Sequence, residues 1–322
     1  MISGRLARHL PLLATGGILL LLFGAAAVAY DGFLSSRVIV NLLADNAFLG
    51  IAAVGMTLVI FSGGIDLSVG AVIGFTSIFT ATLVTGRGLH PAVVWPLAIG
   101  FGAGLGALMG TLIHAFRLPA FLITLAGMFL ARGTAFWLNT DSVGITHPWY
   151  DALANFDLAL GESIHVPAAA LLLLAVVGAG YVVAHHTRFG RTLLAIGGNE
   201  QSALLLGLPV GRARIAVYTL NGAGAALAGI VASVYTSSGN ASMGLGLELD
   251  AIAVVVIGGT LLAGGRGHVA GTLLGVLIFG TIQAAILFDG RLSSWWMRIV
   301  VGALLLAFIL LQRFLVRGVG KR

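Results

Sequence analysis

Long apolar runs recur along the whole chain, and they decide what it can fold into. Most of them approach the roughly 20 residues that a helix needs to cross a bilayer. Charged residues make up only 9% of the 322 residues while 59% are hydrophobic, too little charge to cover a soluble globule. The sequence therefore predicts an all-α polytopic membrane protein, one domain over residues 1–322 with about ten transmembrane helices. The expected spans are residues 10–29, 42–61, 69–86, 92–116, 118–138, 167–184, 215–236, 251–263, 270–288 and 298–316.

Basic residues gather in loops that would share one side of the membrane. An even number of spans starting inside places most of them in the cytoplasm, where basic loops are favoured. We therefore expect both termini to be cytoplasmic. The basic residues on that side are Arg5, Arg8, Arg117, Arg188, Arg191, Arg212, Arg214, Arg266, Arg313, Arg317, Lys321 and Arg322. The acids expected outside are Asp31, Asp141, Asp151, Asp157, Glu162, Glu248, Asp250 and Asp289.

The net charge of +6 follows membrane sidedness and forms no basic patch, so we expect no nucleic-acid partner. The chain has no cysteine, and no disulfide or thiol chemistry is available to it. The small residues Ala27–Ala29 resemble a signal-peptidase site, but the run before them is long enough to span. We expect an uncleaved first helix.

The polar segment 139–166 is expected to be the main outer loop. It contains His147-Pro148 and the aromatic pair Trp149 and Tyr150, which suit a membrane interface. We expect a folded loop or a short helix here that faces a partner or the medium. In the span 92–116, glycines recur, and Gly106-xxx-Gly110 predicts close packing between helices.

The loop 185–214 interrupts the membrane pattern with four arginines at its edges. Inside it, Asn199 is placed to N-cap a short helix that runs to Leu206 and stops at Gly207. Three adjacent leucines, Leu204–Leu206, would then expose apolar surface in a polar loop. They either fold back onto the chain's own membrane helices or dock into a soluble partner.

Two glycine-rich segments, 62–70 and 258–267, interrupt helices near a membrane face. Broken helices in corresponding places of two halves mark the pathway of many transporters, although the likeness here rests on paired glycines alone and leaves an internal repeat open. Asp66 lies in the first break. It is either a cap for the helix that follows, our preferred interpretation, or a functional intramembrane charge. The residues expected as pathway candidates are Asn46, Asp66, Asn221 and Gln283.

The sequence contains no set of residues with the spacing of a known catalytic site. The only lysine is Lys321, so the chain has no Gly-x-x-x-x-Gly-Lys phosphate loop and cannot hydrolyse ATP by that route. His185 and His186 are adjacent and point apart on a helix, which argues against a metal site. An intramembrane protease would need a partner acid at the depth of Asp66, and Asp45 is some twenty residues away. We expect no enzyme activity, no metal and no cofactor.

Several motifs of the chain resemble those of a known family. Asn41–Ile51, Ala53–Ile60 and Ser62–Gly70 are similar to the signature of permease subunits of bacterial monosaccharide ATP-binding-cassette (ABC) importers, the ribose, xylose and galactose group. Thr187–Gly190 and Ala195–Asn199 resemble the family's cytoplasmic coupling segment. Within the family, residues 247–253 and 288–296 are most similar to galactofuranose-type permeases.

The resemblance implies partners and a role for the central loop. Cytoplasmic ABC ATPase subunits would supply energy, a second permease, the same or paralogous, would complete the pore, and a periplasmic sugar-binding protein would deliver the sugar at the inner membrane. The residues expected to couple to the ATPase are Gly197, Gly198, Asn199, Glu200, Gln201, Ser202, Ala203 and Leu204. The alternatives are an ion-coupled secondary sugar transporter with Asp66 as proton carrier, and a non-transporting membrane anchor.

Overall fold

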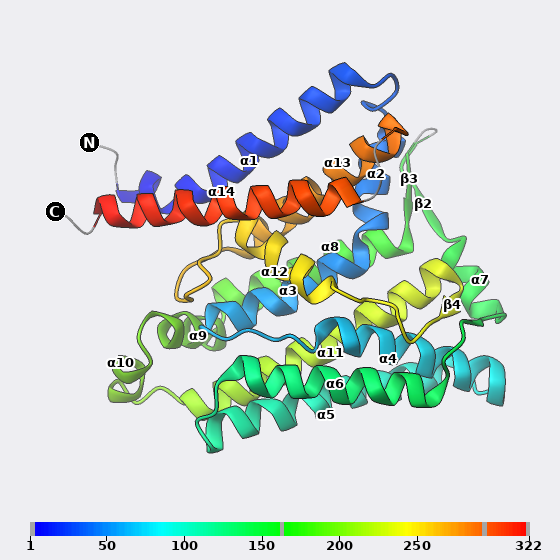
Figure 1. Cartoon of the computed structure of the whole chain (residues 1–322), viewed down its shortest axis with the longest axis horizontal. Coiled ribbons are helices and arrows are strands. Elements are labelled where there is room, and N and C mark those ends of the chain that lie inside the picture. The colour runs from blue at the N-terminus through cyan, green and yellow to red at the C-terminus, as the bar shows by residue number, and fades with distance from the viewer. Residues whose placement is uncertain (1–3, 162–163, 292–294, 320–322) are drawn as a thin grey trace.

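The computed structural model describes residues 4–161, 164–291 and 295–319, and this part of the chain is mostly helical (Figure 1). The helices are α1 (Gly4–Ala29), α2 (Ser36–Asp45), α3 (Ala47–Phe61), α4 (Val69–Ala81), α5 (Pro91–Ala115), α6 (Ala120–Leu138), α7 (Pro148–Ala154), α8 (Ala168–Tyr181), α9 (Arg188–Gly198), α10 (Glu200–Leu205), α11 (Val210–Thr236), α12 (Leu247–Ile257), α13 (Val269–Asp289) and α14 (Trp295–Val319). The π-helical turns η1 (Thr82–Gly86) and η2 (Val182–His186) extend α4 and α8. Glu162, Leu292, Ser293, Ser294, Lys321 and Arg322, used in the sequence arguments, lie outside the described residues.

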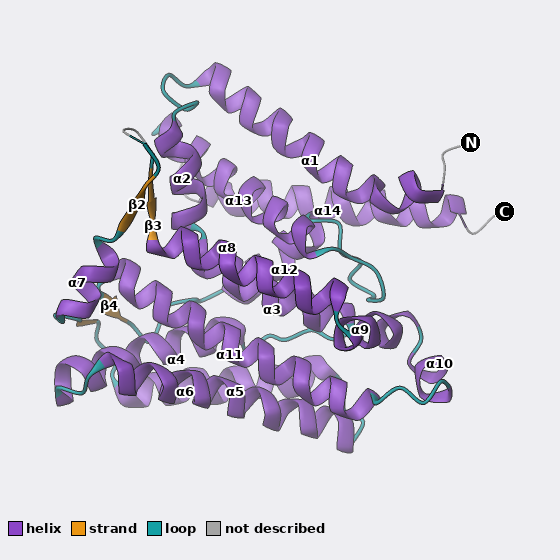
Figure 2. Ribbon diagram, turned by 180° about the vertical axis from the view of Figure 1, so that it is seen from behind, coloured by secondary structure: helices purple, strands orange, loops and turns teal. Residues whose placement is uncertain are grey.

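The centre of the fold is formed by α3 and α4, which are buried on every side. Every residue of α3 is buried except Phe48, and every residue of α4 except Phe79. Helices that are apolar all round belong in the interior of a bundle. Around them, α11 lies against α3, α4 and α5, and α8, α12 and α13 also contact α3. Seen from behind in Figure 2, α4, α5, α6 and α11 lie together on one side of the molecule.

The helices α5 and α11 pack with their backbones in contact because glycine lines the seam. A Cβ at Gly106 would collide with the carbonyl oxygen of Tyr218, and one at Gly110 would lie 2.9 Å from the Cα of Ile215. A Cβ at Gly104, on another face of α5, would meet nothing within 4 Å. The close helix packing predicted for Gly106 and Gly110 is confirmed.

Among the described residues, seven helices are long and apolar enough to cross a membrane, or eight if the bent pair α2 and α3 is one span. The bend between these two helices is 55°, at Asn46. Residues 251–263 were expected to form one continuous helical span, and the structure corrects this. The helix in this region, α12, has 11 residues and stops at Gly258, so it is about 16 Å long against a hydrocarbon core of roughly 30 Å. In the last expected span, the apolar stretch is Trp295–Phe308.

The first helix is an integral part of the bundle. It packs on α13, and the buried hydroxyl of Thr15 donates a hydrogen bond to the carbonyl of Ile257 at the end of α12, at 2.9 Å. The helix therefore covers part of α13.

The molecule has two distinct ends. The outer segment predicted at 139–166 forms α7 and the strands β1 (Val143–Gly144), β2 (Asp157–Ala159) and β3 (His165–Pro167). β2 pairs with β3, and β1 pairs with β4 (Ser238–Gly239), both antiparallel. The expected short helix is therefore present. Both ribbon views show α7 and these strands at one end, and α9 and α10 at the opposite end.

At the strand-bearing end, Tyr150 anchors α7 to the bundle. Its ring is fully buried, and its hydroxyl oxygen accepts a hydrogen bond from Trp95 Nε1 at 3.1 Å and lies 3.2 Å from the hydroxyl of Ser233. Burial raises the pKa of this phenol. Tyr150, expected with Trp149 at a membrane interface, is instead a packed anchor, whereas Trp149 is exposed.

Candidate coupling surface and helix breaks

The short helix predicted after Asn199 is present as α10. The Asn199 side chain accepts a hydrogen bond from the backbone N–H of Ser202 at 2.8 Å, which satisfies one of the free donors at the helix start. The helix ends where Gly207 takes a positive φ of 72°, a conformation that suits glycine at a helix C-terminus. An ion pair of 2.7 Å between Glu200 and Arg214 ties α10 to the beginning of α11.

The part of the chain that the structure describes leaves the three leucines of α10 and its C-cap uncovered. Leu204, Leu205 and Leu206 are 54%, 89% and 78% exposed, so they do not fold back onto the membrane helices. Ala203, by contrast, is only 1% exposed. Ala203 was expected on the docking face, and the structure corrects this: its methyl group packs inside the chain, out of reach of a partner.

The remaining predicted coupling residues divide between surface and interior. Asn199, Glu200, Gln201 and Ser202 are exposed, as is Gly198, whereas Gly197 is partly buried at the end of α9.

The helix α9 was not predicted as a separate element, although its signals are in the sequence. Thr187 caps it by accepting a hydrogen bond from the N–H of Gly190 at 3.2 Å. Leu193 and Ile196, three residues apart, are buried, while Arg188 and Arg191, also three apart, are exposed. This is the pattern of a surface helix. The predicted loop is therefore a pair of helices, α9 and α10, which lie on the surface.

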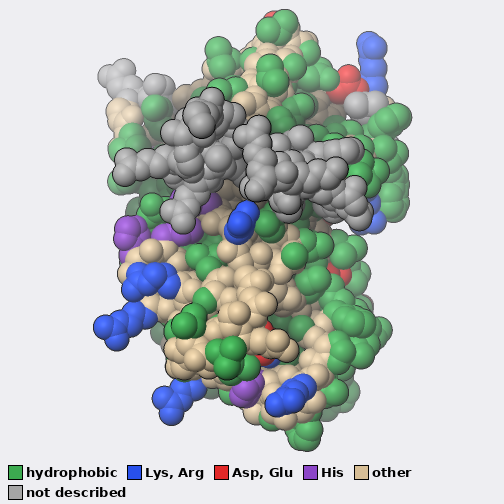
Figure 3. Space-filling view, turned by 90° about the vertical axis from the view of Figure 1, so that its left-hand side faces the viewer, with side chains coloured by type: hydrophobic (Ala, Val, Ile, Leu, Met, Phe, Trp, Pro, Cys, Tyr) green, Lys and Arg blue, Asp and Glu red, His purple; other side chains and the backbone are tan. Residues whose placement is uncertain are grey.

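Arginine side chains surround this pair. Arg188, Arg191 and Arg212 are exposed, as are Arg117 and Arg266 on neighbouring loops. Figure 3 looks onto this end of the molecule and shows basic side chains standing out from it, with few acids in view. We call it the arginine-rich end.

Asp66 and Asn221, predicted separately as pathway candidates, meet inside the protein. One carboxylate oxygen of Asp66 accepts hydrogen bonds from the backbone N–H and the hydroxyl of Ser68, at 2.9 and 2.6 Å. The other accepts from the Asn221 amide nitrogen at 2.8 Å. Both residues are fully buried. The network fastens the first helix break to α11, because Asn221 belongs to that helix.

Asp66 is not itself the N-cap of α4. That position belongs to Ser68, whose side chain makes no capping hydrogen bond, and Asp66 instead holds the Ser68 N–H just ahead of the helix. The carboxylate therefore organises the start of α4 from two residues upstream, close to the capping role we preferred.

The other two candidates lie elsewhere. Asn46 is buried at the bend between α2 and α3, where its amide nitrogen donates to the Leu42 carbonyl at 3.0 Å. Gln283 is exposed on α13. Asp45, once considered as a second carboxylate, accepts a hydrogen bond from the Tyr235 hydroxyl at 3.0 Å. The candidates do not converge on one space.

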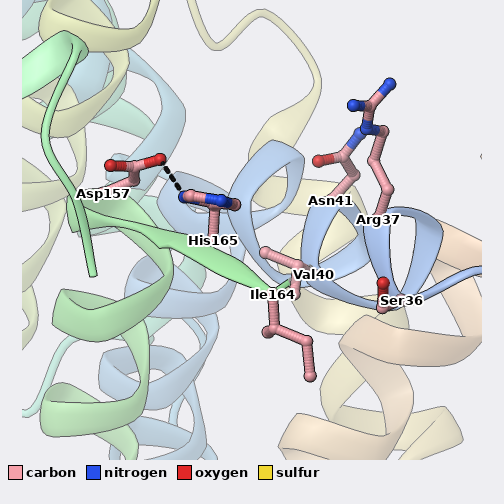
Figure 4. A pocket seen from close by; sticks show the side chains of 7 residues that line it. All are labelled: Ser36, Arg37, Val40, Asn41, Asp157, Ile164 and His165. Atoms are coloured by element: carbon pink, nitrogen blue, oxygen red, sulfur yellow. Dashed lines mark ion pairs between the residues drawn. The ribbon is translucent and has the colours of Figure 1, made fainter. Parts of the chain in front are cut away.

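A pocket of about 400 Å³ opens between α2 and the β2–β3 hairpin, and no sequence pattern predicts it. Figure 4 shows Asp157 and His165 facing each other across the hairpin, with Oδ2 and Nδ1 2.7 Å apart. The pocket is lined by Ser36, Arg37, Val40, Asn41, Asp157, Ile164 and His165. It lies towards the end opposite to α9 and α10.

The second break, the loop between α12 and α13, contacts the first break. Gly259, Gly264 and Gly265 have φ values of 89°, 86° and 75°, which only glycine adopts without strain. The N–H of Gly265 donates to the carbonyl of Phe61, in the last turn of α3, at 3.1 Å. The two glycine-rich breaks recognised in the sequence are therefore in direct contact.

Residues 38–309 match the family described as branched-chain amino acid transport system / permease component. The chain belongs to this permease family. The permease is 52% identical to the inner membrane ABC transporter permease protein YjfF of Escherichia coli over 306 residues, 95% of this chain and 92% of the relative. It is 38% identical to the fructose import permease protein FruG of Bifidobacterium longum over 94% of this chain and 91% of that relative.

The ribose import permease protein RbsC of Escherichia coli is also 38% identical, over 91% of each chain. No solved structure matches. Family membership makes the chain a non-enzymatic permease component whose ATPase is a separate subunit, and a multi-pass protein of the inner membrane. This agrees with the missing phosphate loop.

Proposed function

We propose that this permease is the membrane subunit of an ABC importer that moves a monosaccharide into the cell. Relatives that match over nearly the whole chain are described as ribose and fructose import permeases. The permease itself lacks a phosphate loop, so energy has to come from partner ATPase subunits. A second permease, the same or a paralogue, and a periplasmic sugar-binding protein complete the assembly.

The observation that carries the proposal is the uncovered apolar face of α10. A six-residue helix is marginal alone in water, yet this one is capped at its start, tied by an ion pair and presents three leucines to solvent. Apolar side chains gathered on a polar, arginine-rich end mark a contact with another protein. We assign that contact to the ATPase subunits, through Gln201 and Leu204–Leu206.

We further propose ten membrane crossings with both termini in the cytoplasm. The beginning of α1 and the end of α14 lie at the same end of the molecule as α9 and α10 in both ribbon views. Exposed arginines also cluster at this end, in keeping with the enrichment of basic residues in cytoplasmic loops. The count includes the bent pair α2 and α3, the short α12 with its following loop, and α14.

For the substrate we propose galactofuranose or a related sugar. The support is the resemblance of residues 247–253 and 288–296 to galactofuranose-type permeases. Residues 247–253 form the first two turns of α12, which carry Glu248 and Asp250.

The ion-coupled alternative receives little support from Asp66. A proton carrier has to reach water on each side in turn, whereas the Asp66 carboxylate is fully buried and accepts three hydrogen bonds. The charge serves the structure of the first break.

The proposal is tested by uptake of labelled monosaccharides in cells that contain the permease and its genomic neighbours. We expect galactofuranose uptake that disappears when the ATPase gene is deleted and that persists, while ATP lasts, in the presence of an uncoupler. Uptake that survives loss of the ATPase but collapses with the uncoupler would establish the secondary transporter instead, and absence of flux for every sugar would favour a membrane anchor.

A further inference from the structure

Three segments that are far apart in the sequence meet at glycines near the arginine-rich end. Gly63 follows α3 in the first break, Gly197 lies in the last turn of α9, and Gly264 and Gly265 lie in the second break. We call these four residues the glycine junction.

The junction is a contact between backbones. A Cβ added at Gly197 would collide with the carbonyl oxygen of Phe61 and lie 2.5 Å from the nitrogen of Gly265. A Cβ at Gly264 would lie 2.7 Å from the nitrogen of Gly63. Real side chains do not tolerate such distances, so each position excludes even alanine unless the backbone moves.

A directed bond reinforces the contact. The last carbonyl groups of a helix have no partner within it, and one of them, that of Phe61, accepts the Gly265 N–H at 3.1 Å. Gly63, Gly264 and Gly265 all have positive φ, between 75° and 86°. The conformation therefore favours glycine at all three positions, and the spacing also requires it at Gly264 and Gly265.

The position of the junction connects the surface helices to the interior. On one side, α9 leads directly into α10 with its exposed leucines. On the other side, Gly63 lies three residues before Asp66, whose carboxylate fastens the break to α11. Side chains at an interface can change rotamer and absorb a small shift, but backbones in contact cannot, and tightly packed groups transmit displacement.

We propose that the glycine junction is a positioning element that transmits movement of α9 and α10 to both helix breaks at once. The inference rests on the proposed function, because it assumes that an ATPase moves α10. It adds that energy transfer depends on backbone contact at Gly63, Gly197, Gly264 and Gly265 and not only on the leucine surface. Chains of packed groups with two arrangements are a physical route for such coupling.

The test compares Gly197→Ala with Gly178→Ala in the reconstituted importer. Gly178 is a helical glycine of α8 at which a Cβ would meet nothing within 4 Å, so this control adds the same methyl group to a helix without a clash. The quantity measured is the amount of sugar transported per ATP hydrolysed. A folding defect lowers transport and hydrolysis together, whereas loss of transmission lowers their ratio.

For Gly197→Ala we expect a ratio about tenfold below wild type, an effect of the size found for mutations along coupling networks, with ATP hydrolysis retained. The control should keep the wild-type ratio. If Gly197→Ala does not assemble, Gly63→Ala replaces it, because its Cβ would lie 3.5 Å from the nearest atom and the cost is confined to the positive φ.

The outcomes separate the two proposals. If the wild-type importer shows no ATP-dependent sugar uptake, the proposed function fails and the junction fails with it. If the wild type transports and the variant ratio equals that of the control, the function stands and the junction proposal is overturned. Loss of assembly in both junction variants would also overturn it, by showing a purely structural role.

Discussion

Truncation of Leu205 to alanine should weaken the binding of the ATPase without weakening the fold. Leu205 is 89% exposed, so its side chain contributes almost nothing to the stability of the isolated chain, and surface substitutions of this kind stay within about 0.5 kcal/mol. If the ATPase covers it fully, Leu205→Ala removes three buried carbons from the interface. At about 0.8 kcal/mol per carbon, the loss is about 2 kcal/mol, or roughly 30-fold in Kd.

The assay is a titration of the detergent-solubilised permease with its ATPase subunits, followed by biolayer interferometry, with thermal unfolding of each variant measured in parallel. Leu160→Ala is the matched control, because Leu160 is also exposed, at 56%, but follows β2 at the opposite end. We expect an unchanged Tm for both variants and an increased Kd for Leu205→Ala alone. A Kd within twofold of wild type would refute the assignment of the leucine face to the ATPase.

Further predictions concern the buried hydrogen bonds of Asp66, the helix packing at Gly106 and ATP hydrolysis. Asp66→Asn should keep a Tm near wild type. The amide oxygen of the new side chain can still accept hydrogen bonds from Ser68. Its NH2 group can donate to the Oδ1 of Asn221, which is buried without a partner and can turn to accept this bond. Asp66→Leu should lose about 3 kcal/mol or more in thermal unfolding, because buried donors are left unpaired; equal loss in both variants would contradict this account of the network. Gly106→Ala should cost about 1–3 kcal/mol through its collision with Tyr218, whereas Gly104→Ala should cost nothing, and similar Tm values would disprove the backbone contact. The purified permease alone should not hydrolyse ATP, a phosphate-release assay being sufficient to detect any exception.

Local signals made part of the fold predictable. The N-cap Asn199, the stop at Gly207 and the spacing of Gly106 and Gly110 each act within a few residues, and each was placed correctly. The 55° bend at Asn46 was missed, because neither glycine nor proline marks it. The long apolar run at residues 251–263 suggested a full span, although Gly258 and Gly259 inside it end α12 halfway.

The sequence could not predict which face of each helix is buried or which distant residues are in contact. In a membrane protein the lipid is as apolar as the core, so apolar periodicity does not separate buried from lipid-facing sides. Outside the spans, Ala203 was expected on the docking face of α10, but its small methyl group packs inward. The meeting of Asp66 with Asn221, and of Gly63 with Gly197 and Gly264, joins residues more than a hundred positions apart, and no local pattern announces it.

The most direct test of the account is sugar accumulation in proteoliposomes that contain the permease, its partner permease and the ATPase, with sugar-loaded binding protein outside and ATP inside. We predict accumulation against the sugar gradient that requires ATP hydrolysis, continues with an uncoupler present and falls in step with the weaker ATPase binding of Leu205→Ala. Accumulation that needs no ATPase, or that is unaffected in a Leu205→Ala importer at limiting ATPase concentration, would contradict the claim that α10 couples this permease to its energy source.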